Sequence, residues 1–324
     1  MGIVCLGEIL IDMFPAEVGR NLVNVSSFFP NPGGSCANVA VALARLGKSS
    51  SFIGKVGDDF FGSFLIDTLK NNGVEISGMR VDEKARTTLA FIAMPDENSA
   101  EFIFYRNPGA DLCLKPEDID LQMVKNAQVF HCSSLTLVDE PARSAQFMAA
   151  EAAKNSGVII SYDVNFRPKL WRSQADAIMQ TNKMIAFADL VKVNEVELEL
   201  LTGSRDPKQG GEKLLSQGIK LVAVTLGKNG SYFLTTNARG LVAPFEVKTI
   251  DAIGCGDAFM GAVLSRLAGS ANNQLDLSEG ELRKIFTFAN ASGALTALKH
   301  GVIPALPTEI EVIEFLKERS IIEE

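Results

Sequence analysis

Residues 128–161, QVFHCSSLTLVDEPARSAQFMAAEAAKNSGVIIS, contain one complete strand–helix–strand unit. Two apolar runs of strand length, Gln128–Cys132 and Gly157–Ser161, stand on either side of Pro141–Asn155, whose apolar residues recur with helical spacing. Strands that are apolar throughout and alternate with amphipathic helices are typical of a parallel sheet that is covered on both faces. This stretch therefore predicts an α/β fold with a mostly parallel sheet.

The same alternation continues in both directions along the chain. Further strands are expected at Ile3–Gly7, Ser51–Ile53, Leu190–Val193 and Leu221–Thr225. Helices are expected at Ser35–Leu46, Phe60–Asn71, Asn194–Leu201, Gly256–Leu267, Leu282–Leu298 and Glu309–Arg319. The α/β core thus extends from one end of the chain to the other.

Two segments, Asp12–Pro32 and Gly78–Arg106, interrupt this alternation. Within the second, Thr87–Met94 and Glu101–Arg106 have strand composition and are separated by a polar turn. We expect these segments to form a small antiparallel sheet inserted into the first third of the chain. No shift in composition marks a linker, so residues 1–324 are expected to form one α/β domain that carries this insertion.

The composition limits the possible partners. The 324 residues are 47 % hydrophobic and carry a formal net charge of -8, from 31 basic and 39 acidic residues. The hydrophobic fraction supplies a large core and excludes disorder for the bulk of the chain. The acidic surplus leaves no basic surface for a nucleic-acid backbone or an anionic membrane. We therefore expect neither partner, and any bound anion must be held by a local site.

Cysteine usage and the absence of targeting patterns bear on location. Five cysteines without C-x-x-C spacing, beside only two histidines, favour free thiols over disulfides or a zinc cluster. The segment Met1–Phe14 has no basic residue, unlike a signal or transit peptide. The longest uncharged stretch, Asn21–Ala44, is broken by prolines and glycines, which a membrane-spanning helix would not tolerate. We expect a cytoplasmic protein.

Residues 251–259, DAIGCGDAF, form a glycine-flanked turn that opens an apolar helix. Glycines allow backbone N–H groups to converge, and the helix N-terminus adds partial positive charge, so this turn can hold a phosphate or a developing oxyanion. Asp257 stands in the first helical turn, where its carboxylate is either a base beside the anion or a capping group. An acidic protein can bind a nucleotide in this way.

A second glycine cluster, PGGSCAN at 32–38, precedes a helix of small residues. It would bring Asn38 onto a helix face beside open backbone, although by itself it is equally an ordinary helix start. Other familiar motifs fail: a P-loop would need glycine at Ala42, and a dinucleotide fingerprint would need glycine at Phe259. The two glycine clusters together are therefore the informative pattern.

These two clusters, in this order, resemble the two signatures of the PfkB, or ribokinase-like, family of carbohydrate kinases. The first signature matches Gly33–Gly47 and the second matches Asp251–Leu264, and the likeness extends over nearly the whole chain. The segments most similar to fructokinases are RNPGAD at 106–111, FHCSS at 130–134, DVNFR at 163–167 and NEVE at 194–197. The resemblance implies a ribokinase-like three-layer α/β/α sandwich, with the inserted sheet as a lid.

The resemblance also implies residue roles. Asp257 would be the general base that deprotonates the sugar hydroxyl attacking the γ-phosphate of ATP. Backbone donors to the transferred phosphoryl group are expected at Gly254, Cys255 and Gly256. The signature departs from the family at Ala252 and Ile253, where threonine is usual, and at Cys255, where alanine is usual. An anion site built from backbone groups should tolerate these changes.

Sugar and nucleotide contacts follow from the same resemblance. Sugar contacts are expected at Asp12, Gly33, Gly34, Asn38, Arg106, Asn165 and Arg167. Phe91 and Phe104 are either apolar walls of that site or packing residues of the small sheet. Nucleotide contacts are expected at Lys192, Asn194, Thr225, Gly227, Gly230, Gly254, Gly256 and Asn290. The segment Thr225–Gly230 would equally suit a tight turn after a strand.

Two metal ions are implied. Glu197 matches the position that orders Mg²⁺ through water, and its alternative is a solvated helix charge beside Glu195 and Glu199. Asp251, the carbonyl of Ile253 and the Gly301 loop are the expected K⁺ site, which Ile253 could alter.

The sequence thus predicts an ATP-dependent sugar kinase, with fructose as the preferred substrate. A 2-keto-3-deoxygluconate kinase remains the alternative, since Arg106 and Arg167 could clamp a carboxylate. An inactive binding or regulatory protein on the same fold is the alternative of another class. Because exposed strand edges need covering, a homodimer formed through the lid is also expected.

Overall fold

The computed structural model describes residues 2–17, 19–96, 99–268 and 275–322. Within these ranges the larger sheet has nine strands, in the order β13 (Arg239–Val242), β12 (Ser231–Leu234), β11 (Leu221–Thr225), β10 (Leu190–Asn194), β9 (Ile159–Asp163), β8 (Val129–Ser133), β1 (Ile3–Leu6), β4 (Ser50–Gly57) and β5 (Glu75–Asp82). Neighbouring strands run parallel from β11 to β5, and β12 and β13 are antiparallel additions. The predicted mostly parallel sheet is confirmed.

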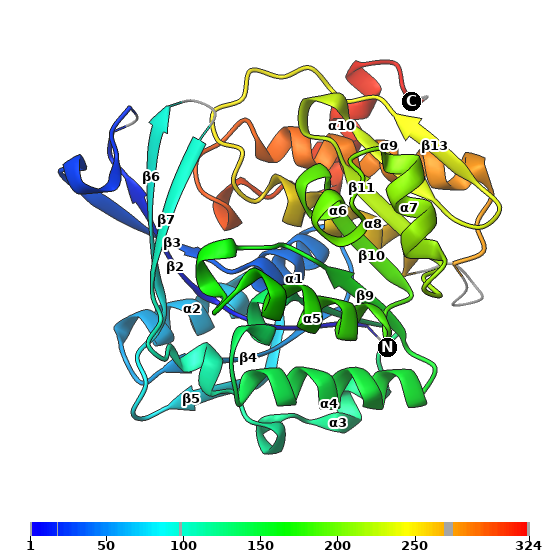
Figure 1. The fold of residues 1–324 in the computed structure, drawn as a ribbon. Helices are drawn as coiled ribbons and strands as arrows, with labels where there is room; N and C mark the ends of the chain where they lie inside the picture. Colours follow the sequence, from blue (N-terminus) through cyan, green and yellow to red (C-terminus); the bar gives the residue numbers. More distant parts are fainter. Residues whose placement is uncertain (1, 18, 97–98, 269–274, 323–324) are drawn as a thin grey trace.

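Helices cover both faces of this sheet (Figure 1). One face packs against α1 (Ser35–Arg45), α2 (Phe60–Asn71), α8 (Cys255–Leu267), α9 (Glu279–Thr296) and α10 (Glu309–Glu318). The other face packs against α3 (Leu121–Lys125), α4 (Ala142–Asn155), α5 (Gln174–Ile185), α6 (Glu195–Thr202) and α7 (Pro207–Leu215). The result is the three-layer sandwich expected from the resemblance.

The strands read as continuous apolar runs because each of their faces is buried. In β1, Ile3 and Cys5 join the core on the α8 side, whereas Val4 and Leu6 join the core on the α4 side. Successive side chains of a strand point to opposite faces, so a strand between two helix layers needs apolar residues at every position. This explains why the sequence pattern predicted the layers.

A smaller sheet stands beside the sandwich, at the left in Figure 1. Its strand order is β3 (Phe28–Gly33), β2 (Leu10–Pro15), β6 (Leu89–Asp96) and β7 (Ser99–Tyr105). The pairs β3–β2 and β6–β7 are antiparallel as predicted, but β2 and β6 run parallel. Residues 78–82 belong to β5 of the large sheet. This edge strand is only partly buried, so its mixed pattern resembles that of the small sheet.

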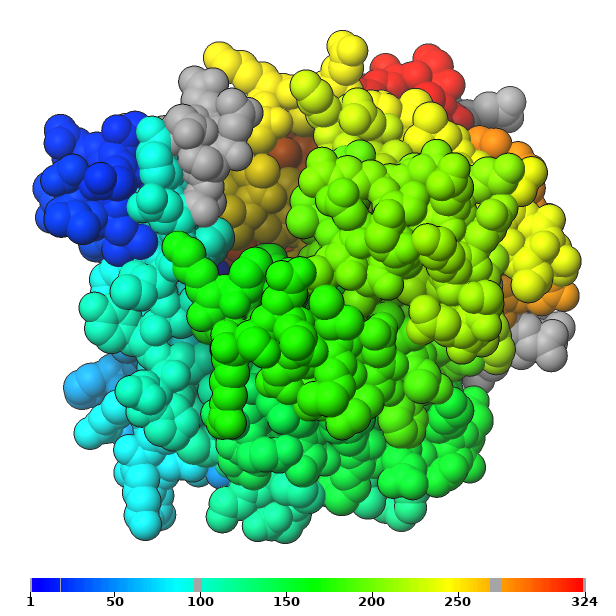
Figure 2. Space-filling model, in the orientation of Figure 1, coloured from blue at the N-terminus to red at the C-terminus, as the bar shows by residue number. Residues whose placement is uncertain are grey.

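The face of the molecule in Figure 2 is hollowed between the small sheet and the yellow-green part of the sandwich. Strands β9, β10 and β11 run parallel, so their carboxyl ends meet at one edge of the large sheet. Ligands of open α/β sheets bind outside the carboxyl ends of the strands. The described residues include no helix that is both long and apolar enough to cross a membrane.

Candidate active site

The glycine turn at the start of α8 has the conformation that an anion site requires. Gly254 is the N-cap with φ +82°, and a Cβ there would lie 2.2 Å from the side chain of Val302. Helix-start N–H groups lack intrahelical acceptors and can bind an anion. The N–H of Cys255 donates to the carbonyl of Ala252 at 3.4 Å, so this predicted donor already has an acceptor within the turn.

Asp257 lies in the first turn of α8 and is buried. Asn38 of α1 donates its side-chain N–H to a carboxylate oxygen of Asp257 at 2.7 Å. Burial raises the pKa of Asp257 to about 7, and the Asn38 hydrogen bond moderates this effect. The two glycine clusters of the sequence therefore meet at one carboxylate, whose affinity for a proton suits exchange near neutral pH.

Of the predicted sugar-binding residues of the first glycine cluster, Gly33 lies beside Asp12 of β2. Gly33 lies against the Asp12 carboxylate, leaving no space for a Cβ. Gly34 caps α1 with φ +112°, and a Cβ there would lie 2.5 Å from the carbonyl oxygen of Glu8. Burial raises the pKa of Asp12 to about 7, and the nearby charge of Asp257 adds to the shift. The structure thus brings Asp12 and Asp257 into electrostatic range of each other.

The loop that follows β9 carries Asn165 and Arg167. Asn165 has φ +36°, a conformation that few residues other than glycine adopt and that asparagine tolerates better than most. The Arg167 guanidinium lowers the pKa of both Asp12 and Asp257, which places its charge near both carboxylates. Its carbon Cζ also lies 5.9 Å from the ring centroid of Phe102 in the small sheet. The loop therefore faces the cleft between the two sheets.

The side chain of Arg106 is buried, and its guanidinium has partners within the protein. It forms an ion pair with Asp111, including a hydrogen bond of 2.8 Å from Nε, and Nη2 donates to the carbonyl of Leu135 at 3.1 Å. Thr88 donates its hydroxyl to the other oxygen of Asp111 at 2.5 Å. Arg106 therefore ties the end of the small sheet to the body.

The two predicted phenylalanine walls lie on opposite faces of the small sheet. Asp12 pairs with Ala90, and Ala90 pairs with Phe104, so Phe104 shares the face of Asp12. Phe91 follows Ala90 in β6, so its side chain points to the opposite face of the sheet. Its ring contacts Phe28, with 5.0 Å between the ring centroids. The structure does not bring Phe91 to the sugar side, because strand register places it on the outer face.

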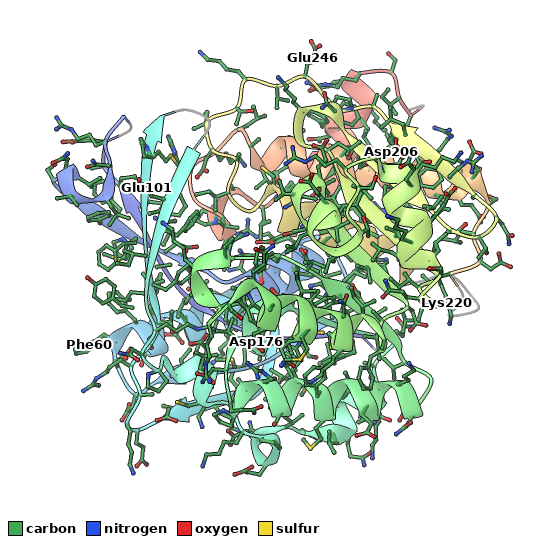
Figure 3. The ribbon with its side chains drawn as sticks, in the orientation of Figure 1. Phe60, Glu101, Asp176, Asp206, Lys220 and Glu246 are labelled. Carbon is green, nitrogen blue, oxygen red and sulfur yellow. The ribbon has the colours of Figure 1, made fainter. Side chains whose placement is uncertain are left out.

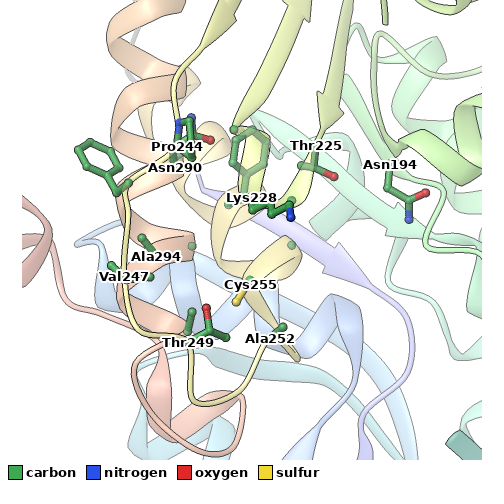
Figure 4. A pocket seen from close by; sticks show the side chains of 18 of the residues that line it. Asn194, Thr225, Lys228, Pro244, Val247, Thr249, Ala252, Cys255, Asn290 and Ala294 are labelled. Carbon is green, nitrogen blue, oxygen red and sulfur yellow. The ribbon is translucent and has the colours of Figure 1, made fainter. Parts of the chain in front are cut away.

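A cavity of about 810 Å³ lies next to the α8 start. Of the predicted nucleotide residues, it is lined by Asn194, Thr225, Gly227, Gly230, Gly256 and Asn290. Figure 4 shows Ala252 and Cys255 at one end of this cavity and Pro244 and Asn290 at the other. Burial raises the pKa of the Cys255 thiol to about 12, so this side chain is a protonated part of the wall. The cavity and the carboxylate site share the α8 start.

The far end of the cavity is mainly apolar. Phe245, Val247 and Ala294 contribute side chains to it. Asn290 donates both hydrogen bonds of its amide nitrogen to backbone carbonyls, those of Val242 at 3.3 Å and Ala243 at 3.0 Å. An apolar wall with a few oriented polar groups is typical of a small-molecule site.

Lys192 and Glu197 form a buried charged group with Asp163. The Lys192 ammonium lies 2.9 Å from the Asp163 carboxylate, and a Cβ on Gly256 would be 3.0 Å from it. Burial alone would lower the pKa of Lys192, but the surrounding carboxylates raise it above its usual value. The side chain of Lys192 is thus a cation directed at the α8 start, and it is not among the residues that line the cavity.

Glu197 is 2 % exposed, so it is not a solvated helix charge. One carboxylate oxygen accepts the N–H of Asn194 at 2.8 Å, in a capping box at the start of α6. The other oxygen accepts the N–H of Phe166 at 2.8 Å. Each oxygen keeps a second lone pair that could accept from water.

The residues of the predicted K⁺ site are adjacent. The Asp251 carboxylate accepts the N–H of Ile253 at 2.9 Å and the N–H of Gly301 at 3.3 Å. Gly301 has φ +79°. Among the residues that the structure describes, no group of three or more His, Cys, Asp or Glu side chains could hold a metal ion. A cation here would need backbone carbonyl, phosphate or water ligands.

Known proteins are similar to this chain in sequence and in fold. The pfkB family carbohydrate kinase profile matches residues 2–309. The chain belongs to the pfkB family of carbohydrate kinases. Fructokinase-2 of Solanum lycopersicum is 43 % identical over 316 residues, which cover 97 % of this chain and 96 % of that protein. It follows that the chain is a phosphotransferase of the kind that acts on a sugar hydroxyl.

Two solved structures are similar over nearly their whole length. A fructokinase with bound ATP from Xylella fastidiosa has a TM-score of 0.89 and 32 % identity, covering 98 % of each chain. A fructokinase from Vibrio cholerae O395, in a form with bound fructose, ADP and calcium ion, has a TM-score of 0.86 and 32 % identity. This match covers 97 % of this chain and 98 % of that one. The pfkB fold is therefore shared from end to end.

Glu8 is a buried acid to which the sequence analysis gave no role in this pfkB chain. Glu8 follows β1, and one carboxylate oxygen accepts the N–H and the hydroxyl of Ser35 at 2.5 and 2.6 Å. Burial raises the pKa of Glu8. The available signal was a charged residue two positions after the buried strand β1, because that position lies at the ligand-binding edge of the sheet.

Proposed function

We propose that this protein is an ATP-dependent fructokinase that transfers the γ-phosphoryl group of ATP to the 6-hydroxyl of fructose. The observation that carries the proposal is the buried Asp257, which lies at the glycine turn, bonds Asn38 and faces the charge of Asp12. The similarity to fructokinases, including structures with bound ATP or with fructose and ADP, supports the choice of substrates.

The proposed chemistry uses Asp257 as the base. Its carboxylate accepts the proton of the sugar hydroxyl while the hydroxyl oxygen forms a bond to the γ-phosphorus, and the bond from that phosphorus to the ADP oxygen breaks. A pKa of about 7 lets the group take and release a proton near neutral pH. The α8 start and the Lys192 ammonium would stabilise negative charge on the transferred group.

Sugar recognition is assigned to the groups around Asp12. Asp12, Asn38, Asn165 and Arg167 offer the acceptors and donors that a polyol requires, with Gly33 and Gly34 allowing close approach. Arg106 is already paired with Asp111, so the two arginines do not form a ready clamp for a carboxylate. This observation favours fructose over 2-keto-3-deoxygluconate. Phe104 is retained as an apolar wall.

We assign the 810 Å³ cavity to ATP, with its apolar end for the base and Gly254–Asp257 for the phosphates. Magnesium ion would be held by the phosphates and, through water, by Glu197, whose oxygens keep free lone pairs. This ion supplies charge neutralisation to the phosphates. Potassium ion is assigned to Asp251, the Ile253 carbonyl and the Gly301 loop.

We assign the small sheet the role of a lid that excludes water from the sugar. Its outer face exposes Tyr105 by 63 %, next to Phe91 at 5.3 Å between ring centroids. Phe60 of α2, which is 95 % exposed, projects from the same side of the molecule (Figure 3). This apolar surface supports a homodimer through the lid. Within the described ranges all five cysteines are free, as suits the cytoplasm.

An ADP-release assay tests the proposal. Purified protein with MgATP is supplied with fructose, 2-keto-3-deoxygluconate, ribose, tagatose or adenosine, with and without potassium. We expect the highest kcat/KM with fructose. A preference for the keto acid would assign the alternative substrate, and no turnover with any acceptor would favour an inactive binding protein. Size-exclusion chromatography showing only monomer at working concentration would remove the dimer.

A further inference from the structure

We infer that Glu197 is a positioning residue that couples the sugar side of the cleft to the nucleotide side. The inference rests on the proposed function, which assigns one side of the cleft to the sugar and the other to the nucleotide. The observation behind it is that the two carboxylate oxygens of Glu197 bind two different segments of backbone. One oxygen accepts the N–H of Phe166 and the other accepts the N–H of Asn194, each at 2.8 Å.

The two segments follow neighbouring strands. Strands β9 and β10 are parallel, with Asp163 paired to Lys192. The chain after β9 carries Asn165 and Arg167, and the Arg167 charge acts on the carboxylates of Asp12 and Asp257. The chain after β10 begins α6 at Asn194, in the wall of the cavity assigned to the nucleotide. A link between these segments is therefore a link between the two substrates.

The bond to Phe166 lies next to the least favourable backbone conformation in the loop after β9. Phe166 stands between Asn165 and Arg167, and Asn165 has the sparsely populated φ of +36°. Such conformations persist only where the surrounding structure holds them. By binding the next N–H along the chain, Glu197 fixes the direction in which the loop presents both predicted sugar-binding side chains.

A capping role at α6 does not account for this arrangement. The capping box needs only the bond from the Asn194 N–H to Glu197 and its reciprocal bond at 2.9 Å. An exposed glutamate would satisfy it, yet Glu197 is buried beside the Lys192 ammonium. Burial raises the pKa of Glu197, and the Lys192 charge moderates this rise. Burying a charge is costly unless it is paired and hydrogen-bonded, so the bond from the Phe166 N–H to the second oxygen is part of what holds Glu197 in this buried position.

The variant Glu197→Gln tests the link. Glutamine keeps the size of the side chain but replaces one of the two carboxylate oxygens with an NH₂ group, so one of the two N–H groups loses its acceptor. The matched control is Glu199→Gln, the same change on the same helix at an exposed position paired with Arg205. Hydrogen exchange of residues 164–171 is measured in the protein without ligands. We expect exchange about tenfold faster in Glu197→Gln and unchanged in Glu199→Gln.

Fructose binding without nucleotide and with a metal chelator separates positioning from metal binding. Calorimetry should show the dissociation constant for fructose raised about tenfold in Glu197→Gln. In turnover at saturating magnesium, KM for fructose should rise more than KM for ATP. A residue that acts only by ordering magnesium would leave exchange and chelated fructose binding unchanged, and that result would overturn the inference.

Two further outcomes have defined meanings. If wild-type protein does not bind fructose, the proposed function fails, but exchange at 164–171 still decides the role of Glu197. If Glu197→Gln does not fold, Glu197→Asp replaces it, because aspartate keeps the charge beside Lys192 while its shorter chain cannot reach both N–H groups. We expect faster exchange at 164–171 in that variant too, and unchanged exchange would overturn the inference.

Discussion

The proposed sugar side of the cleft contains charged side chains, among them two buried carboxylates, whereas the proposed nucleotide side is lined largely by apolar side chains and backbone. Asp12, Asp257 and Arg167 influence one another electrostatically on the first side. Phe245, Val247 and Asn290, whose amide nitrogen is bonded to backbone carbonyls, line the second. Charged groups in a buried site strongly change one another's pKa, whereas an apolar wall contributes to binding through many contacts that are each weak. The comparison predicts large effects from single changes on one side and small effects on the other.

The two sides also differ in their cost to stability. Burial raises the pKa of both Asp12 and Asp257 to about 7, so their ionised forms are disfavoured in the folded protein. The apolar wall of the nucleotide cavity carries no such penalty. The reactive carboxylates of the sugar side thus lower the stability of the fold. Substitutions of these carboxylates are therefore the most sensitive test of the comparison.

The largest effect is expected from Asp257→Asn. The amide can still accept the Asn38 hydrogen bond but cannot remove a proton, so kcat should fall by about 10³- to 10⁴-fold. Steady-state kinetics with fructose measures this loss, and calorimetry should show retained ATP binding. The matched control is Asp67→Asn, at an exposed position of α2, which should leave kcat unchanged. Unchanged turnover in Asp257→Asn would refute the assigned base.

The same variant should be more stable than wild type at high pH. The pKa of Asp257 is about 7 in the folded protein and about 4 in the unfolded chain, so the folded state binds more protons between these values. The contribution of Asp257 to the free energy of unfolding is therefore fully present below pH 4 and is lost as the pH rises to 7. At pH 8 we expect Asp257→Asn to gain about 2–4 kcal/mol of unfolding free energy.

Chemical denaturation at several pH values measures this gain. The difference between Asp257→Asn and wild type should shrink steadily as the pH is lowered from 8 towards 4, because protonation removes the buried charge from the wild-type protein. A variant that is equally stable or less stable at pH 8 would mean that the Asp257 charge is well compensated in the fold.

A smaller, one-substrate effect is expected from Asp12→Asn. The substitution keeps the shape of the side chain and removes its charge, and hydrogen bonds to charged groups contribute about 1.5–3 kcal/mol. KM for fructose should therefore rise about 10- to 100-fold, while KM for ATP stays within about twofold. Equal changes in both constants would show that Asp12 supports the fold of the whole cleft rather than the sugar site.

Much of the fold could be predicted from the sequence because central strands are buried on both faces. The runs at β8 and β9 were recognised on that ground, whereas β12 and β13 were missed, since β13 at the sheet edge alternates exposed and buried residues. Short edge strands have a weak sequence pattern. The same weakness assigned residues 78–82 to the small sheet instead of β5.

The sequence predicted which residues belong to the candidate site better than it predicted which of them contact each other. The Asn38–Asp257 bond joins residues 219 positions apart, a separation across which spacing carries no information. The opposite faces of Phe91 and Phe104 depend on strand register. The bond from Phe166 to Glu197 depends on the loop after β9 lying beside the start of α6. Motifs name such residues, but tertiary packing decides which partners they meet.

The smallest effect is expected on the nucleotide side, from Asn290→Ala. This change removes two neutral hydrogen bonds to the carbonyls of Val242 and Ala243, each contributing about 0.5–1.5 kcal/mol, and leaves the apolar wall in place. KM for ATP should rise about three- to tenfold, with kcat and KM for fructose nearly unchanged. A loss of kcat comparable to that of Asp257→Asn would contradict the contrast between the two sides, because it would place a dominant interaction in the apolar wall.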